Sequence, residues 1–251
     1  MPVGLIVAAG RGARMGAGRP KQFLDLAGAP VLVHVLAVFD RAASIDRIVL
    51  VLPAWELDTC RQQIVAPLGL RTPVELVGGG AERQNSVYNG LAALATEADD
   101  EVVAIHDGVR PFIAADLIDL CIREARHHGS CIPVIPVTET VKRVDADGFV
   151  IESADRRGLR LAQTPQVFRL DLIRRAHEAA RHGGLSATDD AALVESIGVR
   201  VQTIPGDRFN IKITTPEDLA LARGILSAGV WPSSEFPAAA NASTDAQTTD
   251  I

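Results

Sequence analysis

The sequence predicts an α/β fold in which helices cover both faces of a mostly parallel sheet. In the first half of the 251-residue chain, short apolar segments alternate with longer segments of helical periodicity. A repeated βα pattern of this kind builds a parallel sheet, because each helix carries the chain back to begin the next strand in the same direction. A glycine-rich loop also follows the first apolar segment, where α/β proteins bring backbone N–H groups up to a phosphate.

The strands and helices of the first half follow from these patterns. Apolar runs predict strands, and helices are predicted where apolar residues recur every three or four positions, as Val87, Leu91 and Leu94 do. The predicted strands are Val3–Ala8, Arg47–Leu52, Val74–Val77, Glu101–His106 and Ser130–Val137. The predicted helices between them are Val31–Arg41, Ala54–Val65, Glu82–Thr96 and Ala114–His127.

The alternation breaks between residues 138 and 163. Two short apolar stretches, Thr140–Val144 and Phe149–Ile151, lie on either side of a turn signal at Asp145–Gly148. This pattern predicts a protruding β-hairpin arm inserted in the domain. A two-stranded arm is only marginally stable by itself, so we expect it to pack on another surface, such as that of a second subunit.

The regular pattern returns after the arm. Helices are predicted near Asp171–Arg181 and from Thr188, as N-cap, to a C-terminal glycine at Gly198. Strand patterns occupy Arg200–Ile204 and Phe209–Thr214, and the last helix begins at Thr215-Pro216. We therefore expect one domain over residues 1–230 that includes the arm. Residues 231–251 have no hydrophobic periodicity and are typical of a disordered tail.

Composition excludes several classes of protein. A formal net charge of −6 argues against a protein that coats nucleic acid. Apolar runs fall short of the roughly 20 residues that a membrane helix needs, and the N-terminal residues do not resemble a signal peptide. The 3 cysteines show no C-x-x-C spacing, which argues against a disulfide framework or a zinc site. We expect a cytoplasmic protein that binds neither nucleic acid nor a membrane.

The glycine-rich loop after the first strand fits a polyphosphate cradle. It carries four cations, Arg11, Arg14, Arg19 and Lys21. The dinucleotide fingerprint requires glycine at its first, third and sixth positions, but Met15 occupies the sixth position counted from Gly10. The P-loop pattern ends in Gly-Lys-Ser/Thr, whereas Lys21 is followed by Gln22. The loop is therefore a phosphate cradle of another kind, and the alternative is a flexible surface loop with solvated arginines.

Two further loops follow strands whose carboxyl ends share this edge of the sheet. The glycines of Gly78–Gly80 let the backbone approach a planar group, and Ser86 could hydrogen-bond a base or ribose, although an ordinary turn explains both equally well. Asp107 ends an apolar strand, and a carboxylate that faces a polyphosphate needs a cation such as Mg²⁺ between the two. Arg110 follows three residues later, so the alternative is a salt-bridged Asp–Arg turn.

Four motifs, in order, resemble those of the 2-C-methyl-D-erythritol 4-phosphate cytidylyltransferase family. They are Ala8-Ala9-Gly10 through Pro20-Lys21-Gln22, His106 through Pro111, Ala162 through Gln166, and Asn210 through Asp218. The resemblance covers roughly Val3 to Gly229 and implies a single Rossmann-like nucleotidyltransferase domain. The sequence departs from the family pattern at Ala81, because members often carry Asp after the glycines.

The resemblance implies transfer of CMP from CTP to 2-C-methyl-D-erythritol 4-phosphate, with release of pyrophosphate and with Mg²⁺ as cofactor. It implies catalytic roles for Arg14, Lys21, Arg156 and Lys212. It implies CTP contacts for Ala8, Ala9, Gly10, Gly80 and Ser86, and metal binding by Asp107. The implied acceptor contacts are Asp107, Arg110, Thr140, Arg156, Thr188 and Lys212. The family pairs subunits through the arm, so Thr140 and Arg156 would complete the partner's site in a homodimer.

The implied chemistry needs no general base. The second pKa of a phosphate monoester is about 6, so the acceptor phosphate is largely dianionic at neutral pH. Catalysis then rests on positioning and on charge neutralisation around the α-phosphate of CTP. The nucleotide motifs leave alternatives open: a cytidylyltransferase for another sugar-alcohol phosphate such as ribitol 5-phosphate, a guanylyl- or sugar-nucleotide transferase, and a nucleotide-binding protein without catalytic activity.

Overall fold

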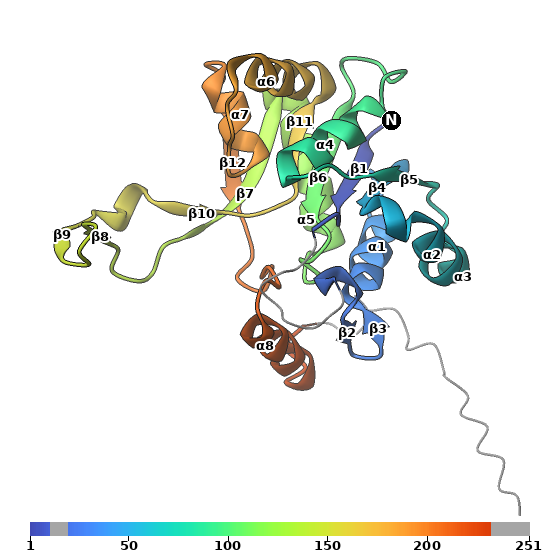
Figure 1. Ribbon diagram of the computed structural model, residues 1–251, viewed down its shortest axis with the longest axis horizontal. Coiled ribbons are helices and arrows are strands. Elements are labelled where there is room, and N and C mark those ends of the chain that lie inside the picture. The colour runs from blue at the N-terminus through green and yellow to red at the C-terminus, as the bar shows by residue number, and fades with distance from the viewer. Residues whose placement is uncertain (11–19, 232–251) are drawn as a thin grey trace, which may run out of the picture.

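In residues 1–10 and 20–231, which the computed structural model describes, eight strands form one central sheet (Figure 1). The strand order is β10-β7-β11-β6-β1-β4-β5, and β12 also pairs with β7. The strands that run in one direction are β1 (Val3–Val7), β4 (Arg47–Leu52), β5 (Val74–Gly78), β6 (Val102–Asp107), β7 (Ser130–Pro136) and β12 (Gln202–Pro205). The strands β10 (Arg160–Ala162) and β11 (Gln166–Arg169) run antiparallel to their neighbours. The mostly parallel α/β fold is therefore confirmed.

Helices cover both faces of this sheet because its strands are apolar on both sides. One face buries Leu5, Val49 and Val51 under α4 (Arg83–Ala92), α6 (Leu170–Gly183) and α7 (Asp190–Ser196). The other face buries Ile6, Ile48 and Leu50 under α1 (Val31–Arg41), α5 (Ala115–His128) and the segment that includes α2 (Leu57–Cys60) and α3 (Ala66–Leu68). Alternate residues of the same strands thus enter different cores.

A third apolar cluster lies at the carboxyl end of the sheet. The last helix, α8 (Pro216–Ser227), packs beside the small hairpin of β2 (Asp25–Leu26) and β3 (Ala29–Pro30), as Figure 1 shows. Leu26, Phe112 and Ile213 are buried together there. The expected N-cap of α8 is confirmed, since the Thr215 hydroxyl accepts a hydrogen bond from the Asp218 N–H. This cluster fastens the segment before α8 next to the loop that follows β6.

The hairpin of β8 (Lys142–Val144) and β9 (Val150–Ser153) extends away from the body (Figure 1). Its apolar side chains are exposed, and the exposed fraction of Phe149 reaches 72%. The chain returns to the main sheet through β10, which pairs with β7. The hairpin lies within the segment expected to form the arm, whereas the expected tail at 232–251 lies outside the described residues.

Several predictions about local structure are wrong. The segment Phe209–Thr214 is a loop rather than a strand, because its backbone is hydrogen-bonded to another loop: the Ile213 N–H donates to the carbonyl of Val109, which follows β6. Asp189, not Thr188, caps α7, since its carboxylate accepts from the Ala192 N–H. The strand β11 was not predicted, because only two of its four residues, Val167 and Phe168, are apolar.

Two helix boundaries also differ from the prediction. The helix expected around Ala54–Val65 is divided into the 3-10 turn η3 (Ala54–Glu56), α2, the π-helical turn η4 (Arg61–Val65) and α3. Pro67 has no N–H to donate to the preceding turn, which disfavours a continuous α-helix there. The α4 helix ends at Ala92, four residues before the expected end.

Leu50 tests the two-faced core. It is fully buried in β4, so we expect Leu50→Ala to lower the free energy of unfolding by about 2–5 kcal/mol through the cavity it leaves. Leu221→Ala, on the exposed side of α8, is the control, and its cost should stay within about 0.5 kcal/mol. Urea denaturation of both variants measures the difference, and equal losses would contradict this description of the core.

Candidate active site

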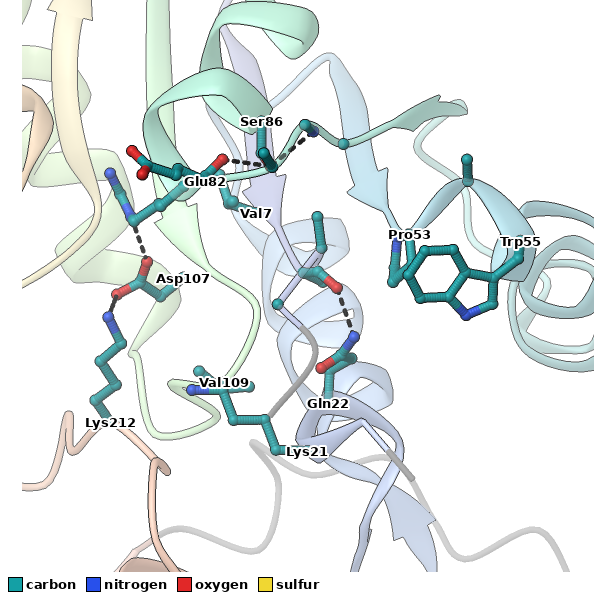
Figure 2. Close-up of a pocket in the computed structure, with 18 residues that line it drawn as sticks. Val7, Lys21, Gln22, Pro53, Trp55, Glu82, Ser86, Asp107, Val109 and Lys212 are labelled. Atoms are coloured by element: carbon teal, nitrogen blue, oxygen red, sulfur yellow. Dashed lines mark hydrogen bonds and ion pairs between the residues drawn. The ribbon is translucent and has the colours of Figure 1, made fainter. Parts of the chain in front are cut away.

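Two adjoining pockets open at the carboxyl edge of the sheet. The larger has a volume of about 400 Å³ (Figure 2), and the smaller has a volume of about 220 Å³. The carboxyl ends of β1, β4, β5 and β6 meet at this edge, as expected for a ligand site in an open α/β sheet. Arg83, Asp107 and Lys212 line both pockets. These three residues therefore mark the junction between the two pockets.

The first wall of the larger pocket is the segment that follows β1. Ala8, Ala9 and Gly10 line it, and Lys21 and Gln22 line it from the other end of the glycine-rich loop. The side-chain amide of Gln22 donates to the Ala8 carbonyl at 2.7 Å. This bond fixes the start and the end of the loop against each other, although residues 11–19 lie outside the described part of the chain.

The second wall is the glycine segment after β5. A Cβ atom on Gly79 would lie 2.3 Å from the Cβ of Ala9, so only glycine permits the observed approach of the two walls. The Gly79 N–H donates to the Leu52 carbonyl at 2.7 Å. Ser86 shapes the same turn, because its hydroxyl accepts from the Gly80 N–H and donates to the Glu82 carbonyl. The backbone of this wall is thus held in place before any ligand binds.

Asp107, the last residue of β6, is surrounded by cations. One carboxylate oxygen, Oδ1, accepts from Arg83 Nε at 3.0 Å. The other, Oδ2, lies 2.8 Å from Lys212 Nζ and 3.6 Å from Arg110 Nε. Burial by itself would raise the pKa of this carboxyl, but the charges of Arg83, Lys212 and Arg110 outweigh burial and hold the pKa well below its usual range.

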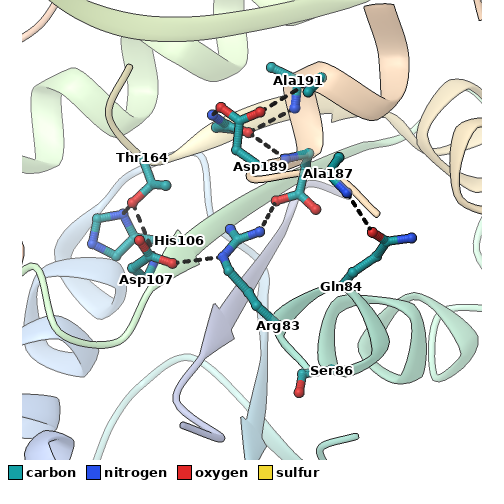
Figure 3. A network of polar contacts seen from close by, with 12 residues as sticks. Arg83, Gln84, Ser86, His106, Asp107, Thr164, Ala187, Asp189 and Ala191 are labelled. Atoms are coloured by element: carbon teal, nitrogen blue, oxygen red, sulfur yellow. Dashed lines mark hydrogen bonds and ion pairs between the residues drawn. The ribbon is translucent and has the colours of Figure 1, made fainter. Parts of the chain in front are cut away.

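Arg83 extends the cluster to a second buried carboxylate, as Figure 3 shows. It is the first residue of α4, and its Nη1 donates to Asp190 Oδ2 of α7 at 2.8 Å. Asp190 is almost fully buried, and although burial opposes ionisation, the Arg83 charge lowers its pKa. Arg83 was not predicted from the sequence, although a cation at a helix start three residues after Gly80 was an available signal. Arg83 joins α4, β6 and α7 around the site.

His106 points away from the pockets into the core. Its Nδ1 lies 3.0 Å from the Thr164 hydroxyl and its Nε2 lies 3.1 Å from the Arg110 carbonyl. Burial lowers the pKa of His106 to about 4, so the ring is neutral at physiological pH. The Thr164 hydroxyl also accepts from the Asp107 N–H. His106 therefore supports the loop around Asp107 from beneath.

The loop before α8 brings Lys212 to the junction. Arg110 Nη1 donates to the Asn210 carbonyl at 2.7 Å, and the buried Asn210 side chain donates to the Thr164 carbonyl at 2.8 Å. These bonds fasten residues 209–212 to the loops that follow β6 and precede β11. The lysine reaches Asp107 from this irregular segment, which is why a strand prediction could not locate it.

The structure brings most of the predicted site residues together. The larger pocket contains Ala8, Ala9, Gly10, Lys21, Gly80, Ser86, Asp107 and Lys212. The smaller pocket adds Arg110 and Thr188. Thr140 and Arg156, which the structure describes, belong to the arm and lie outside the linings of these two pockets. Arg14, like Arg11 and Arg19, lies outside the described residues.

Two negative findings concern the described residues, 1–10 and 20–231. They contain no group of three or more His, Cys, Asp or Glu side chains that could hold a metal ion. No helix among them is long and apolar enough to cross a membrane. Cys60, Cys121 and Cys131 are buried and form no disulfides with one another.

The chain matches known proteins over most of its length. The family model described as "IspD: 2-C-methyl-D-erythritol 4-phosphate cytidylyltransferase" matches residues 3–228. A curated relative of that name from Geobacillus kaustophilus is 48% identical over 224 residues, which are 89% of this chain and 96% of the relative. The relative from Geotalea uraniireducens is 46% identical over 222 residues, which are 88% of this chain and 95% of that protein.

Solved structures give the same result. The 4-diphosphocytidyl-2C-methyl-D-erythritol synthase of Anaerococcus prevotii superposes with a TM-score of 0.80 at 31% identity, over 90% of this chain and 96% of that one. The 2-C-methyl-D-erythritol 4-phosphate cytidylyltransferase of Thermus thermophilus superposes with a TM-score of 0.73 at 34% identity, over 90% and 100% of the two chains. The chain therefore belongs to the 2-C-methyl-D-erythritol 4-phosphate cytidylyltransferase family.

Proposed function

We propose that this protein transfers CMP from CTP to 2-C-methyl-D-erythritol 4-phosphate and releases pyrophosphate, a step in the synthesis of isoprenoid precursors. The observation that carries the proposal is the cation cluster at the junction of the two pockets. Arg83 and Lys212 line both pockets around Asp107. A junction of this kind suits a reaction in which two phosphorylated substrates meet, and the family membership supports this assignment.

The larger pocket suits CTP and the smaller one suits the acceptor phosphate. Ala9, Gly10 and Lys21 line the larger pocket, and a lysine beside a loop with free backbone N–H groups suits a triphosphate. Arg110, Thr188 and Lys212 surround the acceptor phosphate. One oxygen of the acceptor phosphate attacks the α-phosphorus of CTP, the bond from that phosphorus to the bridging oxygen breaks, and pyrophosphate leaves. Arg14, outside the described residues, belongs to the proposed catalytic set with Lys21, Lys212 and Arg156.

The reaction needs positioned charge rather than a base. The acceptor phosphate has a second pKa of about 6, so it is already a dianion at neutral pH. His106 is neutral and turned into the core, where its two ring nitrogens contact Thr164 and Arg110. Lys212 has three N–H donors and directs one of them to Asp107, so donors remain for a phosphate. Preorganised cations of this kind stabilise the charge that develops in the transition state.

Asp107 also fits a divalent cation. The low pKa of its carboxyl keeps it ionised, and Oδ1 accepts from Arg83 alone among the hydrogen bonds of the described residues, so an acceptor position remains. Mg²⁺ in nucleotide sites typically takes one or two carboxylates plus phosphate oxygens and water, and Asp107 would supply one such carboxylate. When bound, Mg²⁺ would neutralise charge on the triphosphate.

We further propose that the protein is a cytoplasmic homodimer joined through its arms. Exposed apolar side chains gather on the arm, with Ile151 61% exposed and Phe149 72% exposed. Contiguous exposed apolar surface is typical of an interface. Thr140 and Arg156 belong to this arm, away from the pockets of their own subunit. In a dimer, these two residues would reach the acceptor pocket of the partner.

Pyrophosphate release tests the activity directly. Purified protein is incubated with CTP and 2-C-methyl-D-erythritol 4-phosphate, with Mg²⁺ or with a chelator, and compared with reactions that contain GTP or ribitol 5-phosphate. We expect pyrophosphate to form with CTP, the methylerythritol phosphate and Mg²⁺ together. Binding of CTP without turnover would favour a nucleotide-binding protein, and faster turnover of ribitol 5-phosphate would reassign the acceptor.

Lys21→Ala should lower kcat at least about 100-fold, because the variant lacks a preorganised cation for the triphosphate and the leaving pyrophosphate. Arg61→Ala is the matched control: it removes an exposed cation that is not among the residues lining the two pockets. Steady-state pyrophosphate release gives kcat for both variants. A near-native kcat in Lys21→Ala would exclude this role.

Asp107→Asn should destabilise the protein in a pH-dependent way. The pKa of Asp107 is lower in the folded than in the unfolded chain, so its stabilising effect is fully present above the unfolded pKa of about 4, begins to weaken below that pH, and is lost as the pH falls through the folded pKa. At pH 7 we expect a loss of about 2 kcal/mol, since three cations are left without their shared carboxylate and Lys212 is partly solvated.

Urea denaturation at pH 7 and at pH 3.5 measures this dependence. The difference in the free energy of unfolding between native protein and Asp107→Asn should be smaller at pH 3.5 than at pH 7. Asp155→Asn, which removes a carboxylate from an exposed pair with Arg157, should leave stability unchanged at both values. A difference in the free energy of unfolding that stays the same at both pH values would contradict the charge-based account.

Subunit mixing tests the contribution of the arm to the partner's site. Arg156→Ala and Lys21→Ala should each be nearly inactive alone. If Arg156 acts on the partner's site, mixed dimers contain one intact site, and an equal mixture should recover about a quarter of native activity by random pairing of two subunits. The measurement is pyrophosphate release after the two proteins are unfolded and refolded together. No recovery would mean that Arg156 serves its own subunit.

A further inference from the structure

A tryptophan stands at the uncharged end of the larger pocket. Trp55 lines the pocket together with Pro53 and Ala54, and 61% of its surface is exposed. Figure 2 shows Pro53 and Trp55 on the opposite side of the pocket from Asp107 and Lys212. A large aromatic side chain at a pocket rim offers an apolar face to a ligand, so its contribution to binding can be considered separately from that of the cations.

The turn that carries Trp55 is held in place. Pro53 precedes η3 with a φ of −56°, and the Glu56 N–H donates to its carbonyl at 2.9 Å. This turn follows β4 directly and lies beside the glycine wall, because the Gly79 N–H donates to the carbonyl of Leu52, the residue before Pro53, at 2.7 Å. The indole is therefore presented beside the glycines by a rigid strand end, which limits the entropy lost when a ligand binds.

The larger pocket is polarised along its length. On the side of Asp107, the three cations Lys21, Arg83 and Lys212 outnumber the two carboxylates of the lining, Asp107 and Glu82. Uncharged groups, from the Pro53–Trp55 turn and the glycine wall, form the other side. A nucleoside triphosphate has the same polarity, with an anionic chain at one end and a planar base at the other. Charge complementarity therefore directs the base of CTP toward Trp55.

We propose that the indole of Trp55 stacks on the cytosine ring of CTP and supplies affinity for the nucleoside without selecting the base. This inference rests on the proposed function. Ala81, next in sequence to the glycines, offers no side-chain hydrogen bond to the base, so an apolar contact has more to contribute here. Every base has a π-face, so stacking strengthens binding of any nucleotide. Selection of cytosine then falls to Ser86 and to the backbone of the glycine wall.

Calorimetric titration of native protein, Trp55→Ala and Trp55→Phe tests the stacking contact. With CTP, we expect Kd to rise about tenfold in Trp55→Ala, within the range known for the loss of one base–aromatic stack, and to stay within about twofold in Trp55→Phe, which keeps a π-face. Inorganic tripolyphosphate has no base, so its Kd should be the same in all three proteins. Leu221→Ala, another exposed apolar residue, should bind CTP as native protein does.

Kinetics and fluorescence supply readouts that a purely structural role would not move. KM for CTP should rise in Trp55→Ala while kcat stays near native. The substitution should weaken the binding of UTP by the same factor as the binding of CTP. The chain has 2 tryptophans, and Trp231 is buried against Phe112. CTP should therefore quench the fluorescence of native protein and leave that of Trp55→Phe nearly unchanged.

The outcomes separate this inference from the proposed function. Native protein that binds no CTP would overturn both. Native protein that binds CTP, with Trp55→Ala equally tight, would overturn the stacking contact alone. Weaker binding of tripolyphosphate in Trp55→Ala would also overturn it, because the substitution would then have disturbed the phosphate side rather than a base contact.

Discussion

The site depends on one buried carboxylate that holds three cations within a few ångströms of one another. Arg83, Arg110 and Lys212 come from a helix start and two separate loops, and each lies within 3.6 Å of Asp107. Without a shared counter-ion, three such cations would repel each other in a partly buried place. Asp107 offsets this repulsion, and Asp190 pairs with Arg83 as well. Because these two carboxylates cannot neutralise three cations, one positive charge remains in excess where two phosphates would meet.

The fold explains how residues so distant in sequence reach one carboxylate. The strands β1, β4, β5 and β6 end at one edge of the sheet, and α4 starts there too. Apolar runs with helices between them are enough to predict this much from sequence, since the pattern fixes which strands are parallel. The four-residue strand β11 and the loop at 209–214 escaped prediction, because their places depend on partners far along the chain rather than on local periodicity.

In the site too, local sequence features could be predicted, whereas contacts between residues far apart in the chain could not. Asp107 was predicted from its place at the end of an apolar strand, a feature that can be read locally. Lys212 was assigned to the predicted site only through a family resemblance, and Arg83 was not assigned to it at all. A sequence does not show which carboxylate a given cation contacts in the folded chain. The two carboxylates that Arg83 contacts lie 24 and 107 positions away, a separation that only the folded chain shortens.

The proposed reaction needs no general base because the acceptor phosphate is already ionised at neutral pH. An enzyme that had to remove a proton would need a titratable group facing the substrate, whereas His106, beside Asp107 in sequence, is buried, neutral and bonded to Thr164 and Arg110. Its place below the cluster lets it hold the loop that carries Arg110. The histidine therefore helps to position Arg110, and Arg110 supplies charge for the chemistry. Geometry and charge together lower the barrier of such a reaction.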